Sequence, residues 1–588
     1  MNRITRKEFL KRTIGGVSVA ALVQSATGQA QKAGSARVSG PPLDLIVRNG
    51  KVVDGTGEPW FAGSIGIRGG KIVDIGKLPG ATAKQTIDAG GQYVCPGFID
   101  PHTHEEIMMI PDPVMEKFVR QGVTTLVNGN CGHSVSPGNS RKVLEYHWRE
   151  ALISRKRSLM PVEWNGLAGY ARLMASRGGT TINSAVLLGY GTIRWVAMKG
   201  AHNRPPNNQE WKDIDRYVRE GLEQGAVGVS TGLAYIPCSY ATTDEIVRVA
   251  KILAEYDATY ATHTRNSVQT DPTGGIEAIE IGEKGGCRVQ ISHFAGRFKG
   301  ALDMVTEARR RGLQVAADVI PQSVSHRRAS NRTVQALMVY WPGAFDMSEQ
   351  ELRQLLVKPD TRAEILKKVR HFNEDKTRVV IVRAETPKHK PNVGKSIAQL
   401  ATELGRDPND LYMEIVLDDQ NPVVFTTDGN VREPRSGGDE AMARRFGKDN
   451  VLPEGYWTTH ALFGPGSDSL PLDVEEPYGW YEHQRRGAFV GYMKQARANN
   501  VPLEVAVAKA TSLPAQQFRL FDRGLISTGK AADLMVVDLD AYKFPSPAED
   551  DPNNPFPVAS GVSTVIVAGV PVLLEGKLTR AKPGRVLV

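Results

Sequence analysis

The sequence is poor in the features that mark several classes of protein. Its four cysteines are too few and too widely spaced for a disulfide-stabilised scaffold. No stretch offers the roughly 18 consecutive apolar residues of a membrane-spanning helix, so we expect no stable membrane anchor. Aromatic residues make up only 7% of the chain, and none interleave with a basic stripe of the kind that single-stranded nucleic acid requires. The remaining class is a globular protein without a nucleic-acid partner.

Positive charge is concentrated at the beginning of the chain. Of the formal net charge of +9, +4 lies within residues 1–30. A basic segment, Thr5-Arg6-Lys7-Glu8-Phe9-Leu10-Lys11, precedes a mildly apolar run and small residues spaced for a signal peptidase. The segment resembles the twin-arginine export motif of bacteria, with Lys7 in place of the usual second arginine. We therefore expect an export signal over residues 1–30, transient contact with the export machinery, and a periplasmic or secreted protein.

Strand patterns at both chain ends flank a long middle region of alternating strands and helices. In the middle, apolar strand patterns fall at residues 124–128, 184–189, 227–230, 259–263, 288–293 and 314–319. Amphipathic helical patterns lie between them, as at residues 243–254 and 276–284. Such alternation predicts βα units, a parallel sheet and, at this count, a closed barrel. The predicted fold is α/β, a (β/α)₈ TIM-like barrel inserted in a small β-sandwich that both chain ends form.

The domain boundaries follow from these patterns. A flexible linker is expected over residues 31–42, and the two parts of the sandwich over residues 43–95 and 516–588. The barrel takes residues 96–515, and residues from about 325 to 420 exceed ordinary loop length, so we interpret them as an insertion over one barrel face.

Histidines close three of the strand patterns. His102 and His104 follow an apolar strand at i and i+2, and this spacing puts both imidazoles on one face, where they can share a cation. His263 and His293 end two further strands. Because strand ends converge at the carboxyl-terminal rim of a barrel, we expect these side chains to meet there.

One of the cysteines also closes a strand. Cys131 follows an apolar run, and a thiolate is a strong zinc ligand whose charge would offset nearby divalent ions. The other three cysteines lack such company and are expected to pack in the interior. The sequence therefore predicts a site for one or two zinc ions.

A metal-bound water also needs a general base, and a carboxylate at the end of a late barrel strand is the natural candidate. Asp428 follows the cleaner strand pattern. Asp468 has the better position, because it leaves room for one loop and a final helix before the turn at residues 510–515. The residues alone leave both open.

Several segments together resemble the amidohydrolase superfamily, specifically its N-acyl-D-amino-acid deacylase (D-aminoacylase) branch. The resemblance runs from about residue 43 to the end of the chain and is specific as an ensemble. Its main segments are Phe98-Ile99-Asp100-Pro101-His102-Thr103-His104, Gly129-Asn130-Cys131-Gly132, Gly228-Val229-Ser230-Thr231-Gly232-Leu233, Ile291-Ser292-His293, Ala317-Asp318-Val319, Thr511-Ser512-Leu513-Pro514-Ala515 and Gly529-Lys530-Ala531-Ala532-Asp533-Leu534.

The resemblance implies a role for each candidate ligand. A tightly held zinc ion would use Cys131, His263 and His293, while His102 and His104 would hold a second, weaker position that Cys131 can bridge. The Gly-Ser-Asp sequence supplies the catalytic aspartate of that branch, which favours Asp468 over Asp428.

Four positions bear on the substrate. Tyr190 stands where the branch often has a histidine, and Gln322 stands where a tyrosine is common. These two residues and Arg265 are the substrate-binding candidates. A lysine that is frequent after the Ile-Ser-His motif is replaced by Ala295, so the resemblance leaves open substrates other than simple N-acyl-D-amino acids.

The expected function is a zinc-dependent hydrolase of linear amide bonds that deacylates N-acyl-(D-)amino acids, with a small-molecule acyl-amide as its substrate. Two alternatives stay open. The same metal site could hydrolyse cyclic amides, dipeptides, esters or lactones, or the chain could be a catalytically inactive, secreted metal- or carbohydrate-binding scaffold. The sequence does not fix the acyl group, the stereochemical preference or the oligomeric state.

Overall fold

The structure is a computed structural model, and the predicted export signal lies outside the residues it describes, as do Asp428 and Gln322. The described residues are 42–149, 159–265, 273–294, 298–321, 327–329, 347–368, 379–384, 386–418, 423–426, 447–453, 455–470, 481–482, 487–545 and 557–588. Among them, no helix combines the length and the apolar character that crossing a membrane would require.

Eight parallel strands form the central barrel, which confirms the predicted fold class. Their order in the sheet is β16-β12-β11-β10-β9-β8-β7-β6. A parallel bridge between Thr103 and Ser469 joins the segments that follow the two outermost strands of this order. The strands are β6 (Phe98–Asp100), β7 (Val123–Asn128), β8 (Asn183–Gly189), β9 (Gly228–Gly232), β10 (Thr259–His263), β11 (Arg288–Ile291), β12 (Val315–Val319) and β16 (Phe463–Pro465).

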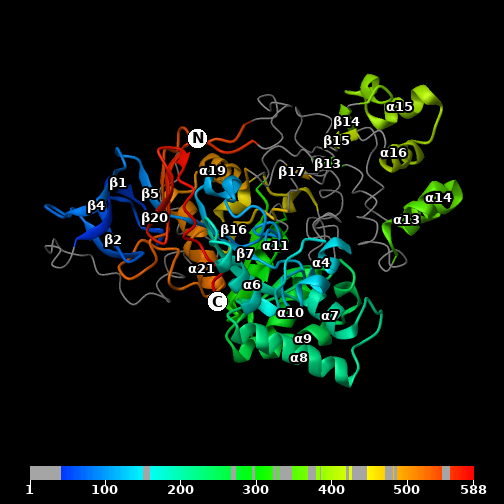
Figure 1. Cartoon of the computed structure of the whole chain (residues 1–588), viewed down its shortest axis with the longest axis horizontal. Coiled ribbons are helices and arrows are strands. Elements are labelled where there is room, and N and C mark those ends of the chain that lie inside the picture. Colours follow the sequence, from blue (N-terminus) through cyan, green and yellow to red (C-terminus); the bar gives the residue numbers. More distant parts are fainter. Residues whose placement is uncertain are drawn as a thin grey trace.

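Helices alternate with these strands and surround them (Figure 1). Side-chain caps fix where several begin: Asn207 accepts from the backbone N–H groups of Gln209 and Glu210, and Thr242 accepts from that of Glu245. The helices are α3 (Glu116–Val119), α4 (Ser140–Arg149), α6 (Gly166–Ser176), α7 (Tyr190–Met198), α8 (Asn208–Glu223), α9 (Thr243–Glu255), α10 (Thr273–Gly285), α11 (Lys299–Arg310), α19 (Ala488–Ala498), α20 (Leu503–Ala510) and α21 (Ser512–Gln517).

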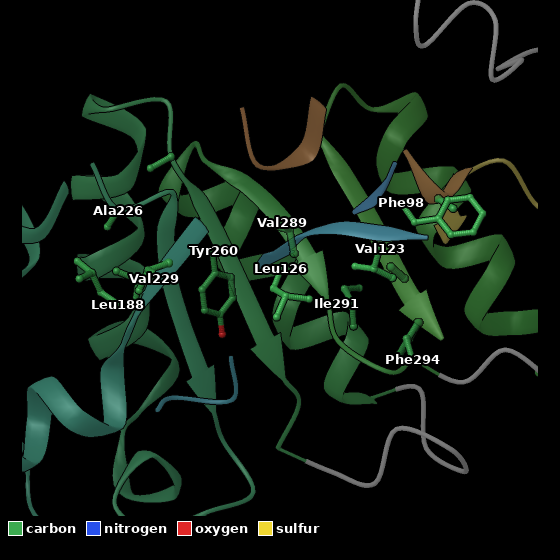
Figure 2. Packing of buried hydrophobic residues seen from close by; sticks show 14 of the residues in the cluster. Phe98, Val123, Leu126, Leu188, Ala226, Val229, Tyr260, Val289, Ile291 and Phe294 are labelled. Carbon is green, nitrogen blue, oxygen red and sulfur yellow. The ribbon is translucent and has the colours of Figure 1, made fainter. Parts of the chain in front are cut away.

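The barrel strands bury side chains on both faces, as parallel strands covered by helices do. The outward-facing residues and the helices share one large apolar cluster, and Figure 2 shows several of its members on the barrel strands, among them Leu126, Tyr260 and Val289. A smaller cluster includes Val127 and Ala261. Because side chains alternate along a strand, His263 lies on the same face as Ala261. That alternation aims the strand-terminal histidine at the barrel interior.

Both ends of the chain join in a single nine-stranded sheet beside the barrel, which confirms that they build one β unit together. Seven strands follow the order β20-β19-β18-β5-β1-β2-β3, with β21 next to β20 and β4 paired to β1. The two halves meet where β5 pairs antiparallel with β18, with Val94 opposite Val536. The strands are β1 (Leu43–Val52), β2 (Phe61–Arg68), β3 (Lys71–Gly76), β4 (Ala83–Asp88), β5 (Tyr93–Pro96), β18 (Leu534–Val537), β19 (Val562–Val567), β20 (Val570–Leu574) and β21 (Lys577–Leu578).

A third unit interrupts the barrel. Most of it lies between β12 and β16, where an insertion was expected, and one of its strands, β17, comes after β16. The unit has its own apolar cluster, and Figure 1 shows its helices at the opposite end of the molecule from β1, β2 and β4. Its four-stranded sheet has the order β14-β15-β13-β17. The elements are β13 (Arg327–Ala329), α13 (Glu349–Val357), α14 (Pro359–Lys368), β14 (Val380–Ala384), α15 (Ile397–Leu404), α16 (Pro408–Leu417), β15 (Val423–Thr426) and β17 (Tyr481–Glu482).

The placement of β15 corrects one expectation. Its apolar sequence made it a candidate for a late barrel strand ending near Asp428. Instead β15 pairs antiparallel with β13 and β14 in the insertion. A short apolar run is compatible with any buried strand, so sequence pattern alone could not assign it to one sheet or the other.

Candidate metal centre

The structure brings the predicted ligand residues together at the carboxyl ends of the barrel strands. His102 and His104 follow β6, Cys131 follows β7, His263 is the last residue of β10, and His293 lies two residues after β11. Two groups of side chains offer ligand atoms that all lie within 4.8 Å of one another. The first group is His102, His104, Cys131 and Asp468, and the second is Cys131, His263 and His293.

Cys131 belongs to both groups. Its Sγ lies 3.3 Å from His102 Nε2, 3.9 Å from His263 Nδ1 and 3.9 Å from His293 Nε2. Three imidazoles from three strands therefore face one sulfur atom. An atom in this position can bridge two metal ions.

Close backbone packing explains the glycines around Cys131. A Cβ at Gly129 would lie 2.1 Å from the carbonyl oxygen of Leu187, and Gly129 has a φ of +82°, a conformation that disfavours other residues. A Cβ at Gly232 would lie 2.3 Å from the carbonyl oxygen of Cys131. The turn after β7 thus sits directly against β8 and β9, which fixes the thiol at the centre of the rim.

Asp468 joins the ligand cluster from β16. Its Oδ1 lies 3.2 Å from His104 Nε2 and 3.3 Å from His102 Nε2. The backbone N–H of Asp468 donates to the carbonyl oxygen of His102 at 2.9 Å, and that of Ser467 donates to Asp100 at 3.1 Å. The segments after β6 and β16 therefore hold each other in register, although they are more than 360 residues apart in the sequence. Of the two candidate bases, the described residues include only Asp468.

The electrostatics of the cluster favour a thiolate among charged neighbours. Burial raises the pKa of the Cys131 thiol, but the positive charge of His102 and hydrogen bonds from three histidines outweigh burial and hold it well below 9.0. Burial lowers the pKa of His104, yet its hydrogen bonds to Asp468 and Cys131 prevail and raise it to about 9. For His263 burial prevails and lowers the pKa, which favours the neutral imidazole that a metal requires.

The substrate-binding candidates make contacts within the protein. Tyr190 is fully buried in α7, and its hydroxyl donates to Glu245 Oε1 at 2.7 Å. Arg265, which follows β10, binds the Glu277 carboxylate at 3.0 Å and donates to the carbonyl oxygen of Ala241. Gln322 lies outside the described residues. Their roles toward a substrate stay predictions.

Two residues that contact the ligands had no role in the sequence-based prediction. The hydroxyl of Tyr235 lies 2.8 Å from His263 Nδ1, and the carboxylate of Asp318 lies 3.1 Å from His102 Nδ1. Asp318 carried a signal of its own, because a carboxylate near the end of an otherwise apolar barrel strand points to the rim. Tyr235 lies in the loop after β9, where the sequence pattern gives no direction for a side chain.

This chain is similar to known proteins over most of its length. Residues 85–409 and 457–573 match the Amidohydrolase family. The N-acyl-D-glutamate deacylase of Alcaligenes xylosoxydans xylosoxydans is 29% identical over 557 residues, which cover 93% of this chain and 96% of that protein. The D-aminoacylase of the same organism is 28% identical over 558 residues, with 93% and 98% covered.

Solved structures are similar over the same length. The N-acyl-D-glutamate deacylase of Bordetella bronchiseptica, in complex with zinc and a phosphonate that mimics the tetrahedral intermediate, aligns with a TM-score of 0.65 at 25% identity, covering 93% of this chain and 100% of that chain. A D-aminoacylase described as having a binuclear metal centre aligns with a TM-score of 0.64 at 26% identity and the same coverage. The family match spans most of the sequence, so this chain belongs to the amidohydrolase family, in its N-acyl-D-amino-acid deacylase branch, and is a hydrolase of C–N bonds.

Proposed function

We propose that this protein is a zinc-dependent deacylase of N-acylated amino acids, with D-amino acids as the preferred configuration. The observation that carries the proposal is the pair of ligand groups that share Cys131 beside Asp468. Relatives that match almost the full length are named for deacylation of N-acyl-D-glutamate and other D-amino acids, which supports the substrate class.

The donor set fits zinc. Imidazole and thiolate are the usual zinc ligands, and the sharing of one thiolate between two groups offsets part of the charge of two ions. Cys131, His263 and His293 would hold one ion, while His102 and His104, with Cys131 and Asp468, would hold a second. A bound zinc ion supplies a water of lowered pKa and a Lewis acid for the acyl carbonyl.

The residues then divide the proton transfers. Asp468 takes a proton from the attacking water while the water oxygen bonds to the acyl carbon. Asp468 then returns that proton to the amine nitrogen as the C–N bond breaks. His104 keeps the carboxylate oriented, because its Nε2 lies 3.2 Å from Asp468 Oδ1. The products are the free acid and the free amino acid, and Asp468 ends each cycle ionised.

Replacing Asp468 by asparagine tests this role. We expect Asp468→Asn to retain the zinc ion that Cys131, His263 and His293 would hold and to lower kcat by about 10²- to 10⁴-fold, because the amide cannot accept the proton. The matched control is Asp533→Asn, a buried carboxylate that pairs with Arg523 away from the rim and should leave kcat unchanged. An Asp468→Asn enzyme that turns over at the wild-type rate would contradict the assignment.

A substrate panel tests the reaction class. Zinc-loaded protein is assayed with D and L forms of N-acyl amino acids, with hydantoins, and with dipeptides and lactones. We expect the highest kcat/KM on N-acyl-D-amino acids and no activity after the metal is removed. Hydrolysis confined to cyclic amides or esters would replace the substrate class, and no hydrolysis in any arm would favour a non-catalytic protein.

A further inference from the structure

Asp318 is a buried carboxylate at the rim that belongs to neither ligand group. It lies on β12, one residue before the strand ends, and only 1% of it is exposed. A Cβ at Gly466 would lie 2.8 Å from Asp318 Oδ1, so the segment after β16 packs directly against this oxygen. Burying a carboxylate costs free energy unless hydrogen bonds compensate it, and the partners of Asp318 therefore matter.

Both carboxylate oxygens are engaged by the rim. Oδ1 lies 3.1 Å from His102 Nδ1 and accepts a hydrogen bond of 2.7 Å from the backbone N–H of His293. Oδ2 accepts a hydrogen bond of 2.8 Å from Gln290 Nε2. One oxygen atom thus contacts a member of each ligand group, because His102 belongs to the first and His293 to the second.

The contact with His102 determines which of its two ring nitrogens could bind a metal ion. A carboxylate only accepts hydrogen bonds, so the Nδ1 of His102 carries the proton when it binds Asp318. In the neutral ring this leaves the lone pair on Nε2, the atom that lies 3.3 Å from Cys131 Sγ. The negative charge of Asp318 also makes that lone pair a stronger ligand.

The contact with His293 holds a strained backbone. His293 has a φ of +35°, in the left-handed region that residues with a Cβ rarely adopt. Its backbone N–H donates to Asp318 Oδ1, and the backbone N–H of Phe294 donates to the carbonyl oxygen of Asp318 at 2.8 Å. These two bonds fix the turn that presents His293 Nε2 to Cys131.

We propose that Asp318 is a positioning residue for the whole zinc centre: it sets the tautomer of His102 and the backbone of His293 through a single oxygen atom. The proposal rests on the zinc-binding function proposed above. It goes beyond that function in tying both ligand groups to one carboxylate, so that the loss of this group weakens zinc binding at each of them.

Zinc titration of the metal-free full-length protein, in competition with a chromophoric chelator, tests the proposal. We expect every zinc-binding step of Asp318→Ala to be about 10- to 100-fold weaker than in the wild type, the loss typical when a group that supports a ligand is removed. Asp318→Asn should lose about tenfold, because an amide oxygen still accepts from His102 and His293 while the negative charge is gone.

The matched control is Asp533→Asn. Asp533 is a buried carboxylate that accepts hydrogen bonds from Arg523, Asn183 and the backbone N–H of Ala568, with no contact to the ligand cluster. We expect it to bind zinc with wild-type affinity even if the substitution lowers stability. Equal weakening in Asp533→Asn and Asp318→Asn would reduce Asp318 to a general structural role and overturn the proposal.

Cobalt substitution gives a second readout. The visible absorption bands of Co²⁺ depend on the geometry of its ligands, and we expect them to change in Asp318→Asn but not in Asp533→Asn. If Asp318→Ala fails to fold, Asp318→Asn carries the test. Wild-type zinc affinity together with an unchanged cobalt spectrum in Asp318→Asn would overturn the proposal, whereas a wild-type protein that binds no zinc would instead overturn the proposed function.

Discussion

The barrel rim and the nine-stranded sheet bury opposite kinds of side chain. The rim encloses ionisable side chains, among them His102, Cys131, Asp318 and Asp468, and each of these four is 7% exposed or less. The interior of the sheet is an apolar cluster in which Ile566 from the C-terminal part packs with residues of the N-terminal strands.

The two regions also differ in which residues have positive φ values. In the sheet these are residues of a bulge and a turn, such as Asn49 and Ala568, whereas at the rim they are ligand residues themselves. At the rim, Cys131, His293 and Asp468 all have positive φ values, of 52°, 35° and 49°. Such conformations cost free energy and persist where the surrounding structure enforces them. The sheet therefore contributes stability, whereas the rim gives up stability to hold a preformed set of ligands. Changes in the two regions should separate activity from stability.

The largest effect is expected at the atom that both ligand groups share. Replacing Cys131 by alanine removes the thiol that belongs to both ligand groups, and we expect zinc affinity to fall by more than about 100-fold, with activity lost alongside it. Zinc content and kcat/KM measure the result. Cys287→Ala is the control, because burial keeps that thiol protonated by raising its pKa to about 12. An active, zinc-loaded Cys131→Ala protein would show that zinc binding and activity do not depend on the Cys131 thiolate.

A change in the sheet should have the opposite profile. Ile566 is fully buried in β19, and replacing it by alanine should lower the free energy of unfolding by about 2–5 kcal/mol. Zinc affinity and the kcat of the folded protein should stay near wild type. Chemical denaturation and zinc titration of the same preparation separate the two quantities. A large fall in zinc affinity would show that the sheet and the rim are coupled.

A further effect should appear as a pH dependence of the free energy of unfolding, which comes from a carboxyl group at the rim. Burial raises the pKa of the Asp100 carboxyl to about 7 against an ordinary 3.8, although hydrogen bonds from Ser467 and His102 oppose this. The folded state therefore binds this proton more tightly than the unfolded state does. Protonation of Asp100 contributes fully to the free energy of unfolding below about pH 3.8, and the contribution is lost as pH rises through 7.

Replacing Asp100 by asparagine removes the loss of stability that ionisation of this buried carboxyl causes as the pH rises. In the metal-free protein we expect Asp100→Asn to be more stable than wild type by about 4 kcal/mol at pH 8 and by much less at pH 4. Denaturation at the two pH values measures the difference. A stability difference that is the same at both would show that Asp100 does not carry the shifted titration.

Local pattern predicted the strands that bring the ligands together. β10 spans Thr259–His263 as predicted, because its apolar alternation ends at a polar residue. The predicted strand at residues 288–293 was too long, since β11 ends at Ile291 and the left-handed His293 cannot continue a strand. The spacing of His102 and His104, and the general rule that barrel strands end at one rim, were enough to predict that the ligands converge.

Contacts between distant residues set the limit of that prediction. Asp318 lies 216 residues from His102, and no periodicity encodes which buried carboxylate meets which imidazole. The resemblance, and not the local pattern, favoured Asp468 over Asp428, because both aspartates follow apolar strands. The sheet to which β15 belongs depends on pairing with β13 and β14, which a single strand sequence does not specify.

Zinc K-edge X-ray absorption of the zinc-loaded protein tests the central claim most directly, because it reports the atoms bound to the metal. A zinc ion held by Cys131 and histidines would show a sulfur neighbour at about 2.3 Å together with imidazole nitrogens at about 2.0–2.1 Å, and that sulfur would be lost in Cys131→Ser. A spectrum with nitrogen and oxygen neighbours alone in the wild-type protein would contradict the account.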